Sequence, residues 1–363
     1  MKNRQKWLSM GITVGGSGFA VIIALALCAI LLAVIGHNPF TVYRQMLDYG
    51  SSSDSLFDIV QRAVPLMLSA VAVAIGFKMN LFNIGVEGQT RFGLLMAAAI
   101  GAQVRLPAVL HVTFCLLIAM VVGAVWAGIA GYLKVTRGVN EVISTIMLNY
   151  IAFSVIGWLF DTYFVISADT LNVKTKELPR TAWFPDLEQG KLTGFLVIAL
   201  LVIAVFWVLV WKTKFGFHLR ASGANPGAAR VAGVNPKRMV MTAMLLSGAV
   251  AGLVGMPGLL GESHAYRRGL AENYGFEGIA VALLGRNHPV GIVLASLLFG
   301  FLDRSSGILQ INEIPQEIVQ IIKGVTVLAV VIVNEALKRW YNRHTQRTAA
   351  EATEALELGA AVA

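Results

Sequence analysis

Residues 108–133 read AVLHVTFCLLIAMVVGAVWAGIAGYL and contain no Asp, Glu, Lys or Arg. An α-helix rises about 1.5 Å per residue, so roughly 20 apolar residues cross the hydrocarbon core of a bilayer. Further long apolar runs occur at 15–35, 143–164, 195–211, 239–260 and 319–333. Because backbone groups within lipid must form hydrogen bonds inside their own segment, such runs are predicted to be helices.

The composition points the same way. Hydrophobic residues make up 56% of the 363 residues, charged residues only 13%, and the mean hydropathy is +0.70. Soluble domains carry about a quarter charged residues. We therefore expect an all-α polytopic membrane protein with about ten transmembrane or half-membrane helices. The expected elements are 15–36, 62–77, one ending near 104, 108–134, 143–164, 194–212, 239–261, 276–285, 290–303 and 317–336.

Charge predicts the orientation. With both termini in the cytoplasm, about 18 of the 29 Lys and Arg residues lie inside, as the positive-inside rule requires. This placement accounts for the net charge of +9 without nucleic-acid binding. The chain then divides into an N-terminal tail over 1–14, a transmembrane domain over 15–336 and a partly disordered tail over 337–363. Residues 165–193 form an external loop, which is either a plain connector or a docking surface.

The N-terminus resembles a secretory signal only superficially. Its apolar run is too long and lacks a small-residue cleavage site, so we expect it to remain as the first transmembrane helix. Cys28 and Cys115 both fall inside apolar runs, where they are expected to pack as small hydrophobic residues.

Residues 77–89, FKMNLFNIGVEGQ, interrupt two apolar helices with polar side chains. Asn80, Asn83, Glu87 and Gln89 are costly at membrane depth unless they are paired or line a cavity. Transporters place substrate sites at such helix interruptions. The alternative is a cytoplasmic turn in which Glu87 pairs with Arg91 at i,i+4.

A second polar group lies at the mouth of the predicted helix 143–164. Asn140 and Glu141 precede it, and Asn149 lies on its first turns. These groups could bind a polar solute, or they could hold neighbouring helices together, which is common for amides in membranes.

A third feature lies in the segment 212–238. Asn225 is a candidate helix N-cap, Pro226 suits the first helical position and Gly233 suits the helix end. A short helix carrying Ala228 and Ala229 suits insertion into a groove of a partner, but it is equally consistent with an ordinary capped loop.

A fourth segment, 275–289, contains an apolar part that is too short to span a membrane comfortably. Glu277 near its start is favoured by the helix dipole, whether or not it has a function. No G-x-x-x-x-G-K-[ST] motif, metal-ligand spacing or nucleophile motif is present in the sequence. We therefore expect no catalytic residue, no metal site and no bound cofactor in this chain.

The motifs together resemble a known family. Residues 80–89, NLFNIGVEGQ, closely resemble the hallmark of bacterial ABC-importer permeases for nucleosides, and residues 140–150 are similar to the same subgroup. This subgroup belongs to the family that also serves ribose and branched-chain amino acids. Residues 223–233, with 247–255, resemble the family's ATPase-coupling loop and following helix, and 275–280 also fits. The resemblance covers about residues 40–335, and 286–289 departs from the glycine-richer turn usual in the family.

The resemblance implies a permease in a bacterial inner membrane that imports nucleosides. Its implied partners are a cytoplasmic ATPase that holds ATP and Mg²⁺, a second related permease and a substrate-binding lipoprotein. The predicted pathway residues are Asn80, Asn83, Glu87, Gln89, Asn140, Glu141, Asn149 and Glu277. The predicted coupling residues are Gly223, Asn225, Ala228, Ala229 and Gly233. The alternatives are ribose or another small polar solute, a stand-alone secondary carrier, or a membrane-embedded enzyme, for which no catalytic group is found.

Overall fold

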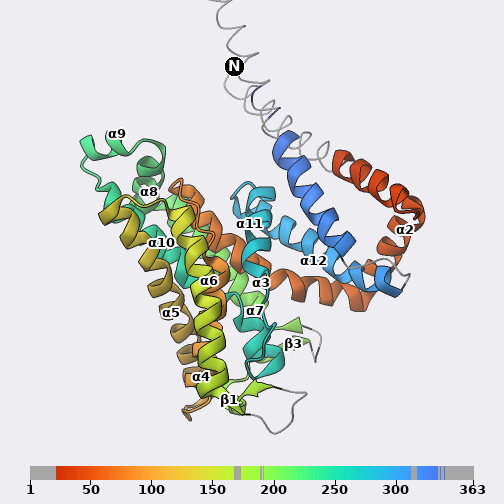
Figure 1. Cartoon of the computed structure of the whole chain (residues 1–363), viewed down its shortest axis with the longest axis horizontal. Helices are drawn as coiled ribbons and strands as arrows, with labels where there is room; N and C mark the ends of the chain where they lie inside the picture. Colours follow the sequence, from red (N-terminus) through yellow and green to blue (C-terminus); the bar gives the residue numbers. More distant parts are fainter. Residues whose placement is uncertain are drawn as a thin grey trace, which may run out of the picture. The chain divides into compact units, whose positions relative to one another are not determined.

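The computed structural model describes residues 22–166, 173–188, 190, 192–311, 317–333, 336 and 339 (Figure 1). The predicted tail 1–14, the start of the first predicted helix and nearly all of 337–363 lie outside these residues. The chain divides into two compact units, one formed by Asp48–Gly307 and the other by the flanking segments up to Leu47 and from Ile308. The features discussed below lie in the Asp48–Gly307 unit unless stated otherwise.

Six helical segments of the described residues are long and apolar enough to cross a membrane. They are Ser53–Lys78, Ala108–Arg137, Glu141–Phe164, Phe195–Lys212, Pro236–Ser263 and Pro289–Leu309. A seventh span results if Ile22–Val34 and Pro39–Gly50, which meet at a bend of 117°, are counted as one. Helices α4 (Val86–Gly101), α11 (Tyr274–Leu284) and 317–333 are shorter. The mainly helical, multi-span architecture is confirmed, while the total of about ten elements and the orientation of the termini stay predictions.

Two helices differ in length from the sequence-based expectation. Helix α3 spans Ser53–Lys78 and so begins nine residues before the expected start at 62, because the Ser52 hydroxyl accepts a hydrogen bond from the Ser55 amide at 3.3 Å and caps it. Helix α12 spans Pro289–Ile311 rather than 290–303. The early start of α3 brings polar residues from an expected external segment onto a membrane helix.

Helices α5 (Ala108–Arg137) and α10 (Pro236–Leu253) cross with their backbones in close contact. A Cβ on Gly248 would lie 2.3 Å from the Gly123 carbonyl oxygen, and one on Gly252 would lie 2.0 Å from the Ala119 oxygen. Glycines four residues apart thus let the two backbones touch, as in other membrane helix pairs. This crossing holds α10 in place behind α3 and α4.

Several spans end in π-helical turns. Phe160–Phe164 follows α6 (Glu141–Leu159), Val208–Lys212 follows α7 (Phe195–Trp207), and Pro257–Ser263 follows α10. Wider turns of this kind occur frequently at functional sites. The third of them forms part of the cavity described below.

The segment 165–193, expected to be a loop, contains two antiparallel hairpins in its described parts. Strand β1 (Val165–Ile166) pairs with β2 (Lys174–Thr175), and β3 (Asp186–Glu188) pairs with β4 (Leu192–Thr193), while the 3₁₀ turn Arg180–Ala182 lies between the hairpins. The Leu178 amide donates to the His264 carbonyl at 2.8 Å, and the Phe184 amide donates to the Leu260 carbonyl at 2.9 Å. The segment is therefore fixed to the chain that follows α10.

The segment 212–238 contains α8 (Lys214–Ala224) and α9 (Pro226–Val231). The Asn225 side chain accepts from the Ala228 amide at 3.0 Å, Pro226 opens α9, and Gly233 adopts a φ of +81° after its end. The predicted cap, first residue and stop signal are thus confirmed. Cys28 and Cys115 are buried and unbridged, as expected.

Candidate functional site

The Asn- and Gly-rich stretch is a buried turn between α3 and α4. The backbone reverses at Asn80, which is exposed and has a φ of 59°. Asparagine tolerates this left-handed conformation better than most residues. Asn83, Glu87 and Gln89, by contrast, are all 1% exposed or less.

Asn83 forms the centre of a side-chain network. Its Nδ2 donates to Gln89 Oε1 at 3.0 Å and to Ser247 Oγ at 2.9 Å, while its Oδ1 accepts from the Gly85 amide and from Gln89 Nε2, both at 3.0 Å. Ser247 Oγ in turn donates to the Ala72 carbonyl at 2.6 Å. The network joins the turn to α10 and α3.

Asn149 joins the same turn to α6. Its Oδ1 accepts from the Gly88 amide at 2.9 Å, and its Nδ2 donates to the Ile84 carbonyl at 3.0 Å. The first bond satisfies one of the N–H groups in the first turn of α4 that have no partner within the helix, and the second binds the carbonyl just before that turn. Asn149 is 3% exposed.

Glu87 is fully buried and its carboxylate has three partners. Its Oε1 receives the Arg91 guanidinium at 2.6 Å and the Asn273 amide at 2.9 Å, and its Oε2 receives the Gly275 amide at 2.8 Å. The predicted Glu87–Arg91 pair is therefore present. The carboxylate additionally binds the backbone at the N-terminus of α11, where helix geometry favours a negative charge.

The other predicted pathway residues have separate local roles. Asn140 is the exposed N-cap of α6 and accepts from the Val142 amide at 2.8 Å, and Glu141 forms an ion pair with Lys134. Glu277 lies half-buried in the first turn of α11. The structure thus brings Asn83, Glu87, Gln89 and Asn149 together around one turn and places Asn80, Asn140, Glu141 and Glu277 outside those contacts.

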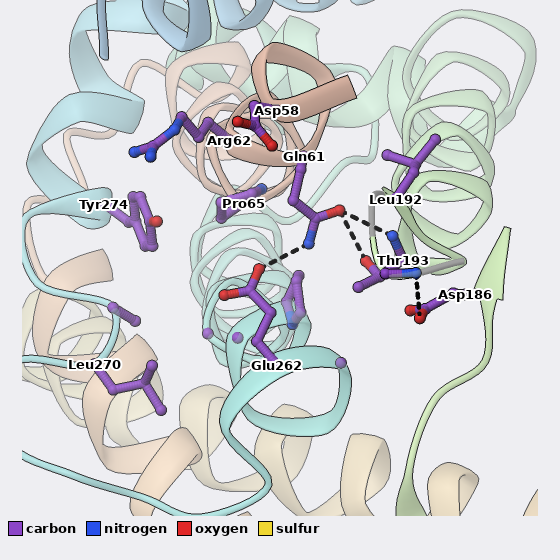
Figure 2. Close-up of a pocket in the computed structure, with 16 residues that line it drawn as sticks. Asp58, Gln61, Arg62, Pro65, Asp186, Leu192, Thr193, Glu262, Leu270 and Tyr274 are labelled. Carbon is purple, nitrogen blue, oxygen red and sulfur yellow. Dashed lines mark hydrogen bonds between the residues drawn. The ribbon is translucent and has the colours of Figure 1, made fainter. Parts of the chain in front are cut away.

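A cavity of about 390 Å³ opens beside the first half of α3 (Figure 2). Small-molecule sites in proteins usually measure about 300–1,000 Å³. Its walls come from α3, from hairpin β3–β4, from the π-helical turn Pro257–Ser263 and from the segment before α11. In the described part of the chain, none of the eight predicted pathway residues lines it.

The residues that sequence analysis missed carry a readable signal. Asp58, Gln61, Arg62 and Pro65 line the cavity from α3, and they recur at i, i+3, i+4 and i+7 on one helix face. Pro65 has no N–H, so the Gln61 carbonyl lacks its intrahelical hydrogen bond. Freed backbone groups and short polar side chains are typical of transporter binding sites.

Gln61 links three walls of the cavity. Its Nε2 donates to Glu262 Oε1 at 2.8 Å, and its Oε1 accepts from the Thr193 amide at 3.0 Å and the Thr193 hydroxyl at 3.1 Å. Figure 2 shows these side chains converging from α3, β4 and the π-helical turn. An ion pair of 3.0 Å between Asp58 and Arg304 anchors α3 nearby.

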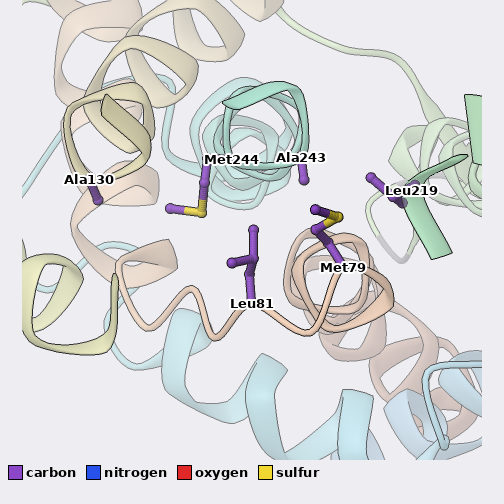
Figure 3. Packing of buried hydrophobic residues seen from close by; sticks show 6 residues of the cluster. All are labelled: Met79, Leu81, Ala130, Leu219, Ala243 and Met244. Atoms are coloured by element: carbon purple, nitrogen blue, oxygen red, sulfur yellow. The ribbon is translucent and has the colours of Figure 1, made fainter. Parts of the chain in front are cut away.

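The opposite end of α3 contacts α8. The Met79 cluster consists of the buried residues Met79, Leu81, Ala130, Leu219, Ala243 and Met244 (Figure 3). A Cβ on Gly223 would lie 2.6 Å from the Met79 carbonyl carbon, so α8 touches the backbone where α3 ends. Gly223, a predicted coupling residue, is therefore partly buried against the end of α3.

The remaining coupling residues divide by exposure. Asn225, Ala228 and Gly233 are exposed, whereas Ala229 is only 4% exposed. The most exposed large apolar side chain among the described residues of this segment is Val231, at 92%, which sequence analysis did not single out. Val231 and Ala228, rather than Ala229, form the outward surface of α9.

The family is shown by comparison with known proteins. The family described as "Branched-chain amino acid transport system / permease component" matches residues 55–331. The chain belongs to this family. It is a multi-pass membrane permease, a transport component rather than an enzyme.

Several curated relatives of this permease cover most of the chain. The guanosine ABC transporter permease protein NupP of Bacillus subtilis is 36% identical over 86% of this chain and 91% of its own length. The nucleoside ABC transporter permease protein NupB of Lactococcus lactis is 32% identical over 86% and 89%. The glucose ABC transporter permease protein TsgB13 of Haloferax volcanii is 31% identical over 92% and 90%. No solved structure matches.

Proposed function

We propose that this permease is one of two membrane subunits of an ATP-driven importer and that its solute is a nucleoside. The observation that carries the proposal is the polar cavity at Gln61, on a chain that is 36% identical to a guanosine permease over most of its length. Amide, carboxylate and hydroxyl groups at the cavity match the donors and acceptors of a base and a ribose.

The proposed assembly contains three further proteins. A separate ATPase binds ATP and Mg²⁺ in the cytoplasm, a second related permease completes the membrane portion, and a substrate-binding lipoprotein delivers the solute. The membrane is the bacterial inner membrane, with both termini in the cytoplasm. In this orientation the cavity faces outward, and α8 and α9 face the ATPase.

Helix α3 supplies the mechanical connection in this proposal. Gln61 and Met79 are eighteen residues apart on or directly after one helix, which corresponds to about 27 Å. A shift of α8 imposed by the ATPase acts on Met79 through Gly223, and α3 transmits it toward Gln61. The solute cavity and the ATPase-facing helices are thereby coupled.

A sugar is the second candidate solute, favoured by the 31% identity to a glucose permease over 92% of the chain. Ribose or another small polar solute fits the same cavity chemistry. A stand-alone carrier is less well supported, because these three relatives are ABC transporter permeases.

Uptake of radiolabelled adenosine and guanosine by cells that express the complete transporter tests the proposal. The expected result is uptake that requires an active ATPase and is blocked by unlabelled nucleosides but not by ribose, glucose or leucine. Uptake of a sugar instead would contradict the nucleoside proposal and support the sugar as the solute. Uptake that persists with an inactive ATPase and collapses with an ionophore would indicate a secondary carrier.

A further inference from the structure

The orientation of the Gln61 amide is fixed by two neighbours of opposite character. The Thr193 backbone N–H can only donate, so it requires the amide oxygen, and the Glu262 carboxylate accepts, so it requires the amide nitrogen. Because the two neighbours lie on β4 and on the π-helical turn, the side chain cannot rotate without breaking a bond to one wall of the cavity.

Both members of the Gln61–Glu262 pair keep unused hydrogen-bonding capacity. The Gln61 amide has a second N–H, and Glu262 Oε2 forms no hydrogen bond with the described residues. Glu262 is exposed to the cavity, so this oxygen is accessible to a solute. The pair therefore presents strong acceptors beside one donor.

We propose that Gln61 and Glu262 form the solute-recognition pair and that they bind an uncharged molecule with two adjacent N–H or O–H donors. The inference rests on the proposed nucleoside function and deepens it. A nucleoside offers such a pair at two places, namely the N–H groups of a guanine edge and the vicinal hydroxyls of ribose. In both cases the carboxylate accepts the two donors, and the amide N–H binds a neighbouring oxygen.

The charge of the cavity disfavours an anionic solute. Asp58, Asp186 and Glu262 line it together with Arg62, and Asp58 is already paired with Arg304. An anionic solute would meet the excess of carboxylates, and like charges brought together in a partly desolvated site discriminate strongly against a ligand.

The variant Glu262→Gln tests the role of the carboxylate. Its amide oxygen can still accept from Gln61, so the internal bond is kept, but the second acceptor is replaced by an N–H donor. Guanosine uptake is measured in proteoliposomes that contain the complete transporter with a fixed amount of binding lipoprotein. We expect Vmax/KM to fall about 10- to 100-fold, which is the loss expected when one hydrogen bond to a charged group is removed. Glu262→Asp, which keeps the charge at a shorter reach, is expected to fall less.

The matched control is Glu188→Gln, an identical change at an exposed carboxylate of β3 that does not line the cavity. It is expected to leave uptake unchanged. Basal ATPase activity and the amount of assembled transporter identify any folding defect. If Glu262→Gln and Glu188→Gln transport guanosine equally well, the recognition pair is refuted while the nucleoside function stands. If the native transporter takes up no nucleoside, the proposed function itself fails.

A modified solute identifies the donors that Glu262 binds. The same binding lipoprotein serves every variant, so its selectivity cancels in the ratio of native to variant uptake. If the native-to-variant ratio for 2′,3′-dideoxyguanosine falls to one, the carboxylate binds the ribose hydroxyls. If the ratio is as large as for guanosine, it binds the base. Both outcomes support the pair.

Discussion

The Glu87 carboxylate binds the Gly275 amide at 2.8 Å across a separation of 188 residues. The approach is close enough that a Cβ on Gly275 would lie 2.3 Å from the Glu87 nitrogen. The bond attaches the start of α4 to the start of α11, and Tyr274, the first residue of α11, lines the cavity. Glu87 therefore supports one cavity wall without lining the cavity itself.

The first prediction concerns removal of the Glu87 charge. Glu87→Gln leaves Arg91 without a buried partner. The variant's amide NH₂ group also replaces one of the two oxygens that accept from the Asn273 and Gly275 amides in the native chain. We expect the free energy of unfolding, measured by denaturation in detergent, to fall by about 3–5 kcal/mol. The control is Glu272→Gln, because this half-exposed carboxylate lies 3.3 Å from the same guanidinium and should cost less than about 1 kcal/mol. Equal losses in the two variants would contradict the capping role.

The second prediction is a dependence of stability on pH. Burial lowers the pKa of His264 below its ordinary value of 6.5, although the carboxylates of Glu177 and Asp186 act in the opposite direction. The ring stacks on Trp183 with 3.8 Å between centroids. The unfolded chain therefore takes up this proton at a higher pH than the folded one. Stability is complete above about pH 6.5 and decreases as the pH falls from there toward the lowered folded pKa.

The melting temperature measured between pH 8 and pH 5.5 checks this sign. His264→Asn should remove the part of the fall in melting temperature at low pH that comes from protonation of His264. Asparagine tolerates the φ of 53° at this position. Identical pH profiles for the native chain and the variant would exclude His264 as the titrating group.

Local signals in the sequence predicted the helices and their caps. Apolar runs such as 108–133 are recognised as membrane helices by comparing their length with the thickness of a bilayer. The Asn225 cap is recognised from the residues of its own loop. The start of α3 was missed because Ser52 lies inside the segment expected to be external, 37–61, where one serine among many polar residues is a weak signal for a helix start.

The candidate site was predicted less well, for a different reason. Asn83, Glu87, Gln89 and Asn149 do gather around one turn, but their polar atoms are used in bonds within the chain. The cavity depends on Gln61, Thr193 and Glu262, whose pairing across 132 and 201 residues has no local signature. Only the spacing of Asp58, Gln61 and Arg62 was visible in the sequence.

The third prediction concerns the contact between α8 and α3. In Gly223→Ala the new methyl group meets the Met79 backbone at 2.6 Å, and backbone atoms cannot move aside as a flexible side chain can. Overpacking of this kind costs about 1–3 kcal/mol and should displace α8 from the end of α3. We expect more ATP to be hydrolysed for each solute imported, measured in proteoliposomes. Gly157→Ala is the control, because nothing lies within 4 Å of its new Cβ, and an unchanged coupling ratio in Gly223→Ala would refute the contact's role.

The fourth prediction separates the surface of α9 from its interior. Val231 is 92% exposed and follows the capped turn at Asn225, so Val231→Glu should leave the permease folded. A charge buried without a partner at a protein interface is costly, and we expect ATPase binding in detergent to weaken about tenfold or more, an energy of roughly 1.4 kcal/mol. Ala229→Glu should instead lower the melting temperature of the isolated permease, because Ala229 is only 4% exposed and its site has no room for a larger, charged side chain. If Val231→Glu binds the ATPase normally, α9 does not use this face for coupling.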